Sequence, residues 1–486
     1  MSSLSDKAVV GVFWAGVEKF GGKAIQFAST IVLARILTPE DYGLIASIII
    51  VFAVAQVLID SGFSQALIRE KNITDQDRAT TFYVNLIIAF LLSILIWFSA
   101  EPISVFYEND TLINLTKLMA VTPLISSLSI IQRAQFIHQI NFKGHAFVYL
   151  VAFLLSSVLA IYAAVEGLGV WALAIQYVSM AFFTSLLFWI VNPWIPKGFI
   201  RKESFERLFG FGYKLMLSGL LDISFKNLYK VLIAKYFQFS ILGFYSQAEN
   251  IKNSISENLI GSVTRANYTT LSKVKDDQER ITDAHIKTVQ VTSYFVFPIM
   301  TGLILVAEPF IITLIGSKWA PSVPILQVIA IAGMINHLQV LNTDVLKIFG
   351  HSGLLLKLQI IKKTGVLIAI IIGIQYGFWG LIIGQVISSY FSLFLNMRYT
   401  AKLIIYPIAD QIKDIIHVLL YSLPMIAIVF VIDGIQFELI WVRLIILILV
   451  GAGTYLGTSF ILKPIFFKNM IYILRPKFKM LNRIKV

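Results

Sequence analysis

The sequence predicts an all-α, polytopic membrane protein, and three observations support this fold class. Hydrophobic residues make up 57% of the 486 positions, charged residues only 14%, and the mean hydropathy is +0.80. Because about a quarter of a soluble domain is charged, little of this chain can face water. Long apolar runs such as 45–59 and 147–162 lack the alternation of barrel strands, so the spanning elements are expected to be helices.

Fourteen hydrophobic segments follow one another along the chain, and a spanning helix needs about 20 residues. The eleventh segment is short unless its helix begins near Leu354. An even number of spans places both termini on the same side of the membrane. The predicted spans are 11–34, 43–66, 80–99, 114–131, 146–165, 169–191, 211–234, 243–263, 289–307, 324–346, 364–376, 378–397, 415–432 and 439–461.

Basic residues are divided unequally between the two faces of this topology. The N-terminal segment, every second connection and the C-terminal tail together hold 29 Lys or Arg residues, whereas the other face holds three, Arg35, Lys235 and Lys318. The positive-inside rule makes the basic face cytoplasmic. The sequence thus predicts a multi-pass membrane protein with both termini in the cytoplasm. This distribution explains the net charge of +13 without a nucleic-acid partner.

Several classes of chemistry lack their residues in this chain. The absence of cysteine excludes disulfides, zinc-thiolate sites, iron–sulfur clusters and cysteine nucleophiles, and the six histidines show no metal-binding spacing. No P-loop or G-x-S-x-G motif is present, and the D-x-D of Asp75-Gln76-Asp77 lies in a short predicted loop without a nucleotide-binding domain. The sequence predicts no enzyme, no metal and no cofactor, and it leaves H⁺ or Na⁺ coupling open.

Three short motifs recur in the same order in the two halves of the chain. Their offsets are 200, 207 and 208 residues, and each motif falls at the same place in the order of spans. The 200-residue offset also relates Gly43 to Gly243. The matching pairs are 31–35 with 231–235, 100–102 with 307–309, and 169–173 with 377–381.

These repeats predict two six-helix lobes, residues 1–195 and 205–400, followed by an appended helix pair at 405–465 and a basic cytoplasmic tail at 466–486. Since six is even, both lobes enter the membrane from the same side and form parallel repeats. Transporters built in this way bind their cargo near the midplane between the lobes. We therefore expect a central cavity that opens to each side in turn.

Charged residues within the predicted spans are concentrated in the first two helices of each lobe. At mid-bilayer such a residue costs about 2.5–3.5 kcal/mol and is a functional candidate by default. The repeat offset matches Gln26 with Lys226 and Thr30 with Lys230, so the same helix face is polar in both lobes. In these four helices the charged residues are Glu18, Lys19 and Lys23 in the first span, Asp60 in the second, Lys214, Asp222, Lys226 and Lys230 in the seventh, and Glu249, Lys252 and Glu257 in the eighth, and Asp344 lies in the tenth span.

This concentration of charge predicts a hydrophilic cavity lined by the first, second, seventh and eighth spans. Lysine ammonium groups suit an anion such as a phosphate, and an intramembrane carboxylate suits cation coupling. A second interpretation stays open, because Asp222–Lys226 and Glu249–Lys252 have the i,i+4 and i,i+3 spacing at which ion pairs merely neutralise each other.

Four sequence blocks resemble conserved segments of a transporter family: LARILTPEDYG at 33–43, DSGFSQALIR at 60–69, YSQAENI at 245–251 and KWAPSVPILQ at 318–327. Through these blocks the protein resembles bacterial polysaccharide-exporting flippases over nearly its whole length. This family is the polysaccharide transporter branch of the multidrug/oligosaccharidyl-lipid/polysaccharide exporter superfamily, with colanic-acid, teichuronic-acid and O-antigen export types.

The resemblance implies two six-helix lobes around a cavity, two extra helices, and an undecaprenyl-pyrophosphate-linked oligosaccharide as cargo, moved from the cytoplasmic to the periplasmic leaflet. It further implies membrane lipids, a polysaccharide polymerase and glycosyltransferases as partners. Spans 415–432 and 439–461 resemble the helices that form a lipid-tail groove in related peptidoglycan-precursor flippases, which suggests that they shelter the prenyl chain.

In those related flippases, cationic residues of the first, second and eighth helices hold the pyrophosphate. The second helix of this chain departs from that pattern, because its only charge is Asp60. The expected headgroup ligands are Lys19, Lys23, Lys226, Lys230 and Lys252, and the expected cavity or cation-coupling acids are Glu18, Asp60, Asp222, Glu249 and Glu257.

Other functions have weaker support in the sequence. A multidrug, cation-coupled exporter of the same superfamily would be expected to have twelve spans and fewer cavity lysines. An integral-membrane polysaccharide polymerase or ligase would be expected to need a sizeable outer loop with catalytic Arg and His. The longest predicted outer connections, 100–113 and 308–323, contain neither residue. A scaffold role also stays open.

Overall fold

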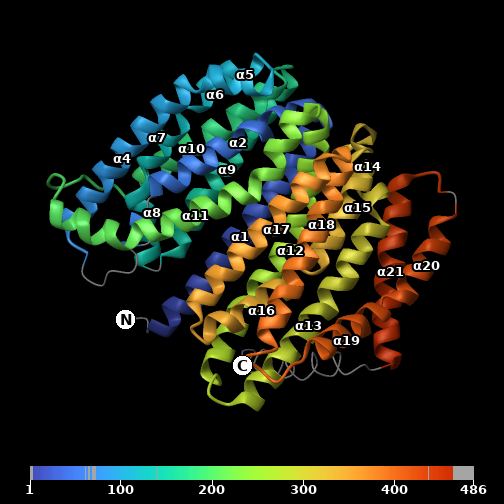
Figure 1. Cartoon of the computed structure of the whole chain (residues 1–486). Helices are drawn as coiled ribbons and strands as arrows, with labels where there is room; N and C mark the ends of the chain where they lie inside the picture. Colours follow the sequence, from blue (N-terminus) through green and yellow to red (C-terminus); the bar gives the residue numbers. More distant parts are fainter. Residues whose placement is uncertain are drawn as a thin grey trace, which may run out of the picture. The chain divides into compact units, whose positions relative to one another are not determined.

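The computed structural model describes residues 4–60, 62–63, 66–67, 73–139, 141–435 and 437–462. Every regular element in these residues is a helix, which confirms the all-α fold class (Figure 1). The chain forms two compact units, Met1–Ser246 and Gln247–Val486. Helix α12 (Phe239–Lys273) begins in the first unit and continues into the second.

Long apolar helices build the first unit. Helix α9 packs against both α1 and α10, and α11 packs against α2. Small residues allow these close approaches: a Cβ on Gly21 of α1 would already lie 3.2 Å from the Leu150 side chain of α9. The helices of this unit are α1 (Leu4–Ile36), α2 (Pro39–Asp60), α4 (Asp75–Phe98), α5 (Ala100–Tyr107), α6 (Thr111–Met119), α7 (Thr122–Ser127), α8 (Ile130–His138), α9 (Phe142–Val165), α10 (Val170–Val191) and α11 (Lys202–Tyr236).

Gly43 and Gly243, which the repeat offset relates, make reciprocal backbone contacts. A Cβ on Gly43 would lie 1.8 Å from the carbonyl oxygen of Phe239, the first residue of α12. A Cβ on Gly243 would lie 1.8 Å from the carbonyl oxygen of Pro39, the first residue of α2. Only glycine fits at either position, so the 200-residue offset in the sequence corresponds to one reciprocal crossing of α2 and α12.

In the second unit a hydrophobic core joins α13 to the C-terminal helices α20 and α21. Tyr294 and Phe297 of α13, Met425 of α20 and Tyr455 of α21 are all buried, and the Tyr455 hydroxyl donates to the Tyr294 carbonyl at 2.8 Å. The helices are α13 (Gln278–Leu305), α14 (Ala307–Ile315), η1 (Ser317–Trp319), α15 (Ser322–Met334), α16 (Asn336–Ile348), α17 (Ser352–Ile374), α18 (Gly377–Thr400), α19 (Ile408–Leu420), α20 (Leu423–Asp433) and α21 (Ile440–Leu462).

An ionic contact also ties the C-terminal pair to the rest of the second unit. Arg443 of α21 pairs with Asp433 at 2.8 Å and with Glu308 of α14 at 3.2 Å. Glu308 belongs to the repeated Ala-Glu-Pro motif, and in this second copy of the motif the glutamate forms an ion pair with an arginine.

The predicted count of fourteen spans is not confirmed. By length and composition, nine helices in the described part of the chain can cross a membrane, or up to eleven if each of two bent pairs is one span. The predicted spans outside that count correspond to α1, α12 and α17, each of which carries at least three charged residues. These three helices are long enough to cross a membrane, and their charged residues distinguish them from ordinary apolar spans.

Three predicted spans are divided between consecutive helices, one of them 324–346, which is divided into α15 and α16 at Ile335. Segment 114–131 is divided into α6, α7 and α8, with a bend of 43° between Thr111–Ser127 and Ile130–His138. At the break, the hydroxyls of Ser127 and Ser129 donate to the carbonyls three residues before them, at 2.7 and 3.3 Å, and so compete with the helical pattern. Segment 415–432 is likewise divided into α19 and α20. The eleventh span begins at Ser352, close to the alternative start at Leu354.

Candidate substrate cavity

The first unit contains a polar cavity of about 810 Å³, within the range of about 300–1,000 Å³ typical of ligand sites. Helices α1, α2, α7, α8, α9, α10 and α11 contribute to its wall. The cavity is unusual for a bundle of apolar helices because carboxamides, hydroxyls and two charges line it. Its longer polar side chains are Gln26, Thr30, Gln56, Asp60, Arg133 and Gln176.

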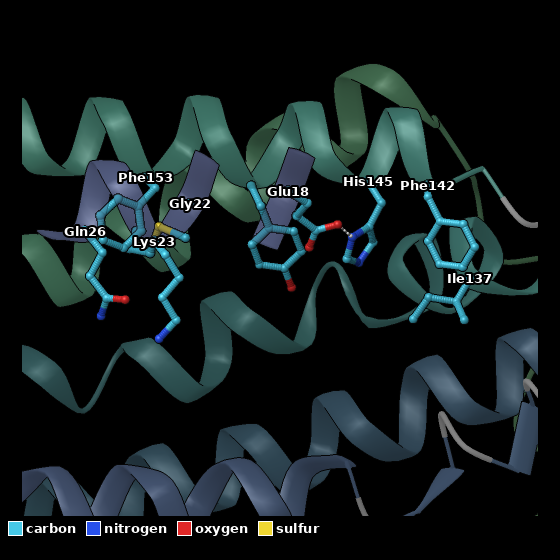
Figure 2. A pocket seen from close by; sticks show the side chains of 10 residues that line it. Glu18, Gly22, Lys23, Gln26, Ile137, Phe142, His145 and Phe153 are labelled. Atoms are coloured by element: carbon cyan, nitrogen blue, oxygen red, sulfur yellow. Dashed lines mark hydrogen bonds and ion pairs between the residues drawn. The ribbon is translucent and has the colours of Figure 1, made fainter. Parts of the chain in front are cut away.

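A second pocket of about 500 Å³ adjoins this cavity along α1 and α9. Gln26, Tyr149, Phe153 and Met180 line both spaces, which are therefore neighbouring parts of one polar region. We call this region the first-unit cavity. Figure 2 shows Lys23 and Gln26 on α1 beside this space, with Phe153 of α9 next to them.

A hydrogen bond between two helices forms part of the wall of the smaller pocket. The Glu18 carboxylate of α1 lies 2.9 Å from Nδ1 of His145 on α9, and the two side chains are mostly buried (Figure 2). The His145 ring packs on Tyr149 one turn further along, with 4.8 Å between ring centroids. The pair is positioned by the start of α9, where the Asn141 side chain accepts from the Gly144 N–H at 3.1 Å.

Two of the predicted site residues line the first-unit cavity with groups that lack a partner. Lys23 lines the smaller pocket, and in the described part of the chain its side chain forms no hydrogen bond or ion pair. Asp60 lines the larger cavity, and its Oδ1 atom is buried without a hydrogen-bond partner among the described residues. Gln26 and Thr30, predicted for the polar face of the first span, line it as well.

The other predicted residues of the first unit lie elsewhere on their helices. Asp222, Lys226 and Lys230 belong to α11, and each is engaged in an interaction within the protein. Where α11 lines the cavity, it does so with Leu215, Met216, Gly219 and Ile223. The structure therefore does not bring the α11 lysines to the first-unit cavity. The Lys19 side chain lies outside the described residues.

In the second unit, Glu249 and Lys252 of α12 are buried, with 7% and 8% of their surface accessible. Both are engaged in interactions within the protein. The aliphatic stem of Lys252 packs on Gly333 of α15, where a Cβ would lie 3.2 Å from Lys252 Cγ. The Glu257 side chain lies outside the described residues.

Arg133 and His145 are cavity residues that the sequence did not single out. Both fall in 132–145, which was predicted to be a cytoplasmic connection, whereas α8 continues to His138 and α9 begins at Phe142. The polar composition of α8 concealed its helical continuation. Glu18 and His145 are 127 residues apart, so no local pattern could have revealed their pairing.

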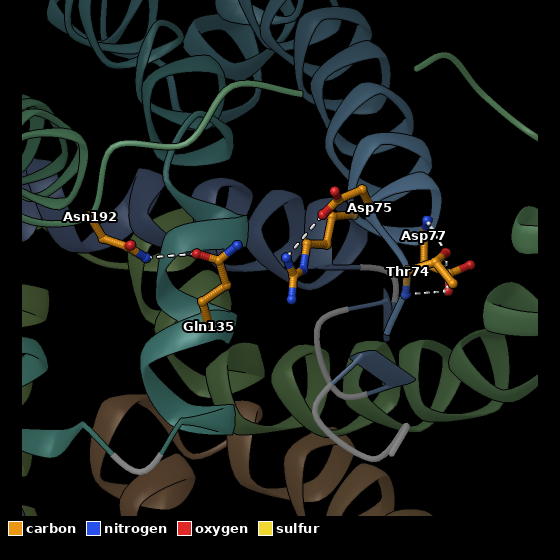
Figure 3. Close-up of polar contacts among 6 residues, drawn as sticks. Thr74, Asp75, Asp77, Gln135 and Asn192 are labelled. Carbon is orange, nitrogen blue, oxygen red and sulfur yellow. Dashed lines mark hydrogen bonds and ion pairs between the residues drawn. The ribbon is translucent and has the colours of Figure 1, made fainter. Parts of the chain in front are cut away.

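The D-x-D motif has a structural role at the start of α4 (Figure 3). Thr74 and Asp77 form a reciprocal capping box, and the buried Asp77 also accepts from Arg207 at 2.5 Å. The Gln76 side chain donates to the Phe199 carbonyl, and Asn192 donates to Gln135 at 2.7 Å. The motif thus helps to fasten the segment between α10 and α11 to α4 and α8.

Comparisons with known proteins agree with this architecture. A family model described as polysaccharide biosynthesis protein matches residues 32–324, more than half of the chain. An uncharacterized membrane protein in the cps region of Klebsiella pneumoniae is 26% identical over 94% of this chain and 96% of its own length. A succinoglycan biosynthesis transport protein of Rhizobium meliloti is 25% identical over 66% of this chain and 65% of its own length.

Among solved structures, the lipid II flippase MurJ in an inward closed conformation has the same fold, with a TM-score of 0.74. It is 18% identical, and the match covers 95% of this chain and all of that one. The fold and the family match together confirm the resemblance stated from the four sequence blocks. The chain therefore belongs to the polysaccharide biosynthesis protein family.

Proposed function

We propose that the protein moves undecaprenyl-pyrophosphate-linked oligosaccharide from the cytoplasmic to the outer leaflet of the bacterial cytoplasmic membrane by alternating access. Membership of the family supports a flippase for lipid-linked polysaccharide precursors in general. The observation that carries the finer proposal is the first-unit cavity, where the cation of Lys23 lines the smaller pocket and has no partner among the described residues.

The physical difficulty of the reaction lies in the headgroup. A charged pyrophosphate and a polar glycan are very costly to place in hydrocarbon, whereas the prenyl chain can remain in lipid throughout. A water-accessible cavity with ammonium or guanidinium groups lowers this cost by pairing with the phosphates. Lys23 is positioned for this role, and Lys19, Lys226, Lys230 and Lys252 stay predicted ligands from the sequence.

Energy coupling and partners follow from the same proposal. Asp60 and Glu18 are carboxylates at the wall of the first-unit cavity and are the candidates for H⁺ or Na⁺ coupling, without a bound cofactor. The proposed function is transport rather than catalysis. Glycosyltransferases supply the lipid-linked glycan, and a polysaccharide polymerase takes it up on the outer side. Helices α20 and α21 are proposed to shelter the prenyl tail.

The proposal includes a membrane orientation with both termini in the cytoplasm. A fused reporter that is active only in the cytoplasm tests this orientation. We expect activity for a fusion after Lys202, at the start of α11, because that segment carries the predicted cytoplasmic charge. A fusion after Asn109, between α5 and α6, should be inactive. Activity at Asn109 would reverse the orientation and with it the proposed direction.

The central experiment replaces Lys23 and measures export. In a strain that lacks the chromosomal gene, Lys23→Ala should abolish surface polysaccharide and cause lipid-linked precursor to accumulate, at normal protein amounts in the membrane. Loss of one partner from a buried charge pair costs about 2–5 kcal/mol. Lys23→Arg should retain part of the activity because it keeps the charge.

The matched control is Lys117→Ala. Lys117 is a half-buried lysine of the same unit, but it lies over the Trp97 ring rather than at the cavity. The Lys117→Ala strain should export polysaccharide normally. Full export by Lys23→Ala would remove Lys23 from the headgroup site. Transport of drug cations by purified protein that leaves lipid-linked glycan in place would favour the multidrug exporter instead.

A further inference from the structure

We propose that Arg133 is a second cationic ligand of the headgroup phosphates, acting with Lys23 in the first-unit cavity. In this chain the broken helix α6–α8 would thus supply the cation that the second helix lacks. The inference rests on the proposed function, because it assigns a further residue to the same anionic substrate.

The first step is the position of Arg133. It lines the 810 Å³ cavity and is exposed, whereas its neighbours Gln132 and Ala134 on α8 are buried. In the described part of the chain its guanidinium forms no ion pair or hydrogen bond. Guanidinium is the side chain best suited to bind a phosphate through two parallel hydrogen bonds, so an uncommitted one in a cavity is a strong candidate for an anion ligand.

The second step is the rigidity of the element that carries Arg133. The Trp189 indole donates to the Leu128 carbonyl at the break before α8, at 2.9 Å. Gln135 accepts from Asn192 at 2.7 Å (Figure 3). Ile131 packs in a core with residues of α2 and α4. These contacts on the sides of α8 fix its rotation, so that position 133 faces the cavity.

The third step concerns two other polar residues of the larger cavity, Thr122 and Asp60. Thr122 of α7 lines the same cavity and is 7% exposed, and its hydroxyl has no partner among the described residues. Asp60, the other charged residue of the larger cavity, forms no ion pair with Arg133 in the described part. A buried hydroxyl without a partner is costly, and a polar ligand or its water shell in this cavity would supply Thr122 with a partner.

The fourth step is the connection to Lys23. Tyr149 lines both parts of the first-unit cavity and lies within electrostatic range of both Arg133 and Glu18. Glu18 is already committed to His145, at 2.9 Å. Among the described residues that line the first-unit cavity, Lys23 and Arg133 are therefore two cations without an ion pair or hydrogen bond, and a headgroup with two phosphates can engage both.

Farnesyl pyrophosphate, a short prenyl pyrophosphate, is a suitable probe for the purified full-length protein in detergent. A charge-assisted hydrogen bond contributes about 1.5–3 kcal/mol, and tenfold in Kd corresponds to about 1.4 kcal/mol. We expect Arg133→Ala to weaken probe binding by about tenfold or more, and Arg133→Lys to be intermediate. Lys143→Ala is the matched control, because Lys143 lies over the Trp14 ring nearby. The Lys143→Ala protein should bind the probe as tightly as the unaltered protein.

A labelling measurement keeps the test independent of the alanine variant's folding. The chain has no cysteine, so Arg133→Cys and Lys143→Cys each introduce one reactive thiol. Farnesyl pyrophosphate should slow the reaction of a water-soluble thiol reagent at position 133 and leave position 143 unchanged. Equal protection at both positions, or none at 133, would overturn the inference.

The outcomes separate this inference from the proposed function. If Lys23→Ala loses probe binding and Arg133→Ala binds as tightly as the unaltered protein, Arg133 is not a ligand and the flippase proposal stands. If the unaltered protein binds neither farnesyl pyrophosphate nor a lipid-linked glycan, both proposals fail. Additive losses in the double variant would contradict a shared headgroup, because residues that bind one ligand group are expected to be coupled.

Discussion

The two units of the chain use their polar residues in different ways. In Met1–Ser246, polar side chains line an open cavity, and the described cations Lys23 and Arg133 are uncommitted. In Gln247–Val486, Glu249 and Lys252 are buried and engaged. The two units do not coincide with the two sequence repeats, because α11 belongs to the second repeat and lines the cavity of the first unit. Charged residues that the sequence groups together are therefore placed at a cavity wall in one unit and among packed helices in the other.

Polar contacts of the second unit show this internal use directly. His337 of α16 and Ser293 of α13 are both buried and lie 2.8 Å apart. The Thr400 hydroxyl of α18 donates to the Asn342 carbonyl of α16 at 3.2 Å. In an apolar environment such contacts between helices favour one packing arrangement. The contrast between the cavity-lining charges of the first unit and the buried Glu249 and Lys252 of the second leads to four predictions.

The largest effect is expected where both repeats kept the same contact. Gly43→Ala or Gly243→Ala would place a Cβ 1.8 Å from a backbone carbonyl oxygen that cannot rotate away. We expect a loss of about 3 kcal/mol or more in stability, seen as a large fall in melting temperature or in folded protein.

The control for this prediction is Gly302→Ala in α13, where a Cβ would meet nothing within 4 Å. That variant should be neutral or gain about 0.5–1 kcal/mol, since alanine favours a helix over glycine. A normal melting temperature for Gly43→Ala would show that the reciprocal crossing of α2 and α12 is not required for folding.

The second prediction separates stability from binding. Arg443→Ala removes the ion pairs to Asp433 and Glu308 and should cost about 1–2 kcal/mol of stability, while farnesyl pyrophosphate binding is unchanged. Lys23→Ala should have the opposite profile, with normal stability and weak binding. Thermal unfolding and probe titration of both variants form the test, and the contrast between the units fails if either variant loses both properties.

Much of this architecture could be predicted because its cause is local. Apolar runs predicted all-α spans, and the offset from Gly43 to Gly243 marked a real structural correspondence. The cavity could be predicted only in part. Lys23, Gln26 and Asp60 are polar residues within predicted spans and could be identified from the sequence. Arg133 could not, because the polar composition of α8 resembles that of a loop. Its exposure to the cavity depends on contacts from Trp189 and Asn192, which are distant in sequence.

The third prediction concerns water access in the first unit. Single cysteines at Gln26 and Thr30, which line the cavity, should react with a water-soluble thiol reagent in intact membranes. Cysteines at Leu154 and Leu186 should not, although 52% and 43% of these side chains are exposed on the isolated chain, because lipid covers them. Equal reaction at all four positions would mean that the cavity wall is no wetter than the lipid-facing surface.

The smallest effect is expected at an exposed ion pair of the first unit. Lys235 donates to the Glu108 carboxylate at 2.7 Å, and this hydrogen bond, together with the charge of Lys235, holds the pKa of Glu108 below its usual value. A carboxyl whose pKa is depressed by folding stabilises the protein above its unfolded pKa and loses that contribution as pH falls through the folded pKa. Since Glu108 is fully exposed, the contribution is small. Glu108→Gln should therefore lower the melting temperature slightly at neutral pH, and the difference from the unaltered protein should vanish in acid. A difference that persists or grows at low pH would mean that Glu108 acts through packing at the left-handed end of α5 rather than through its charge.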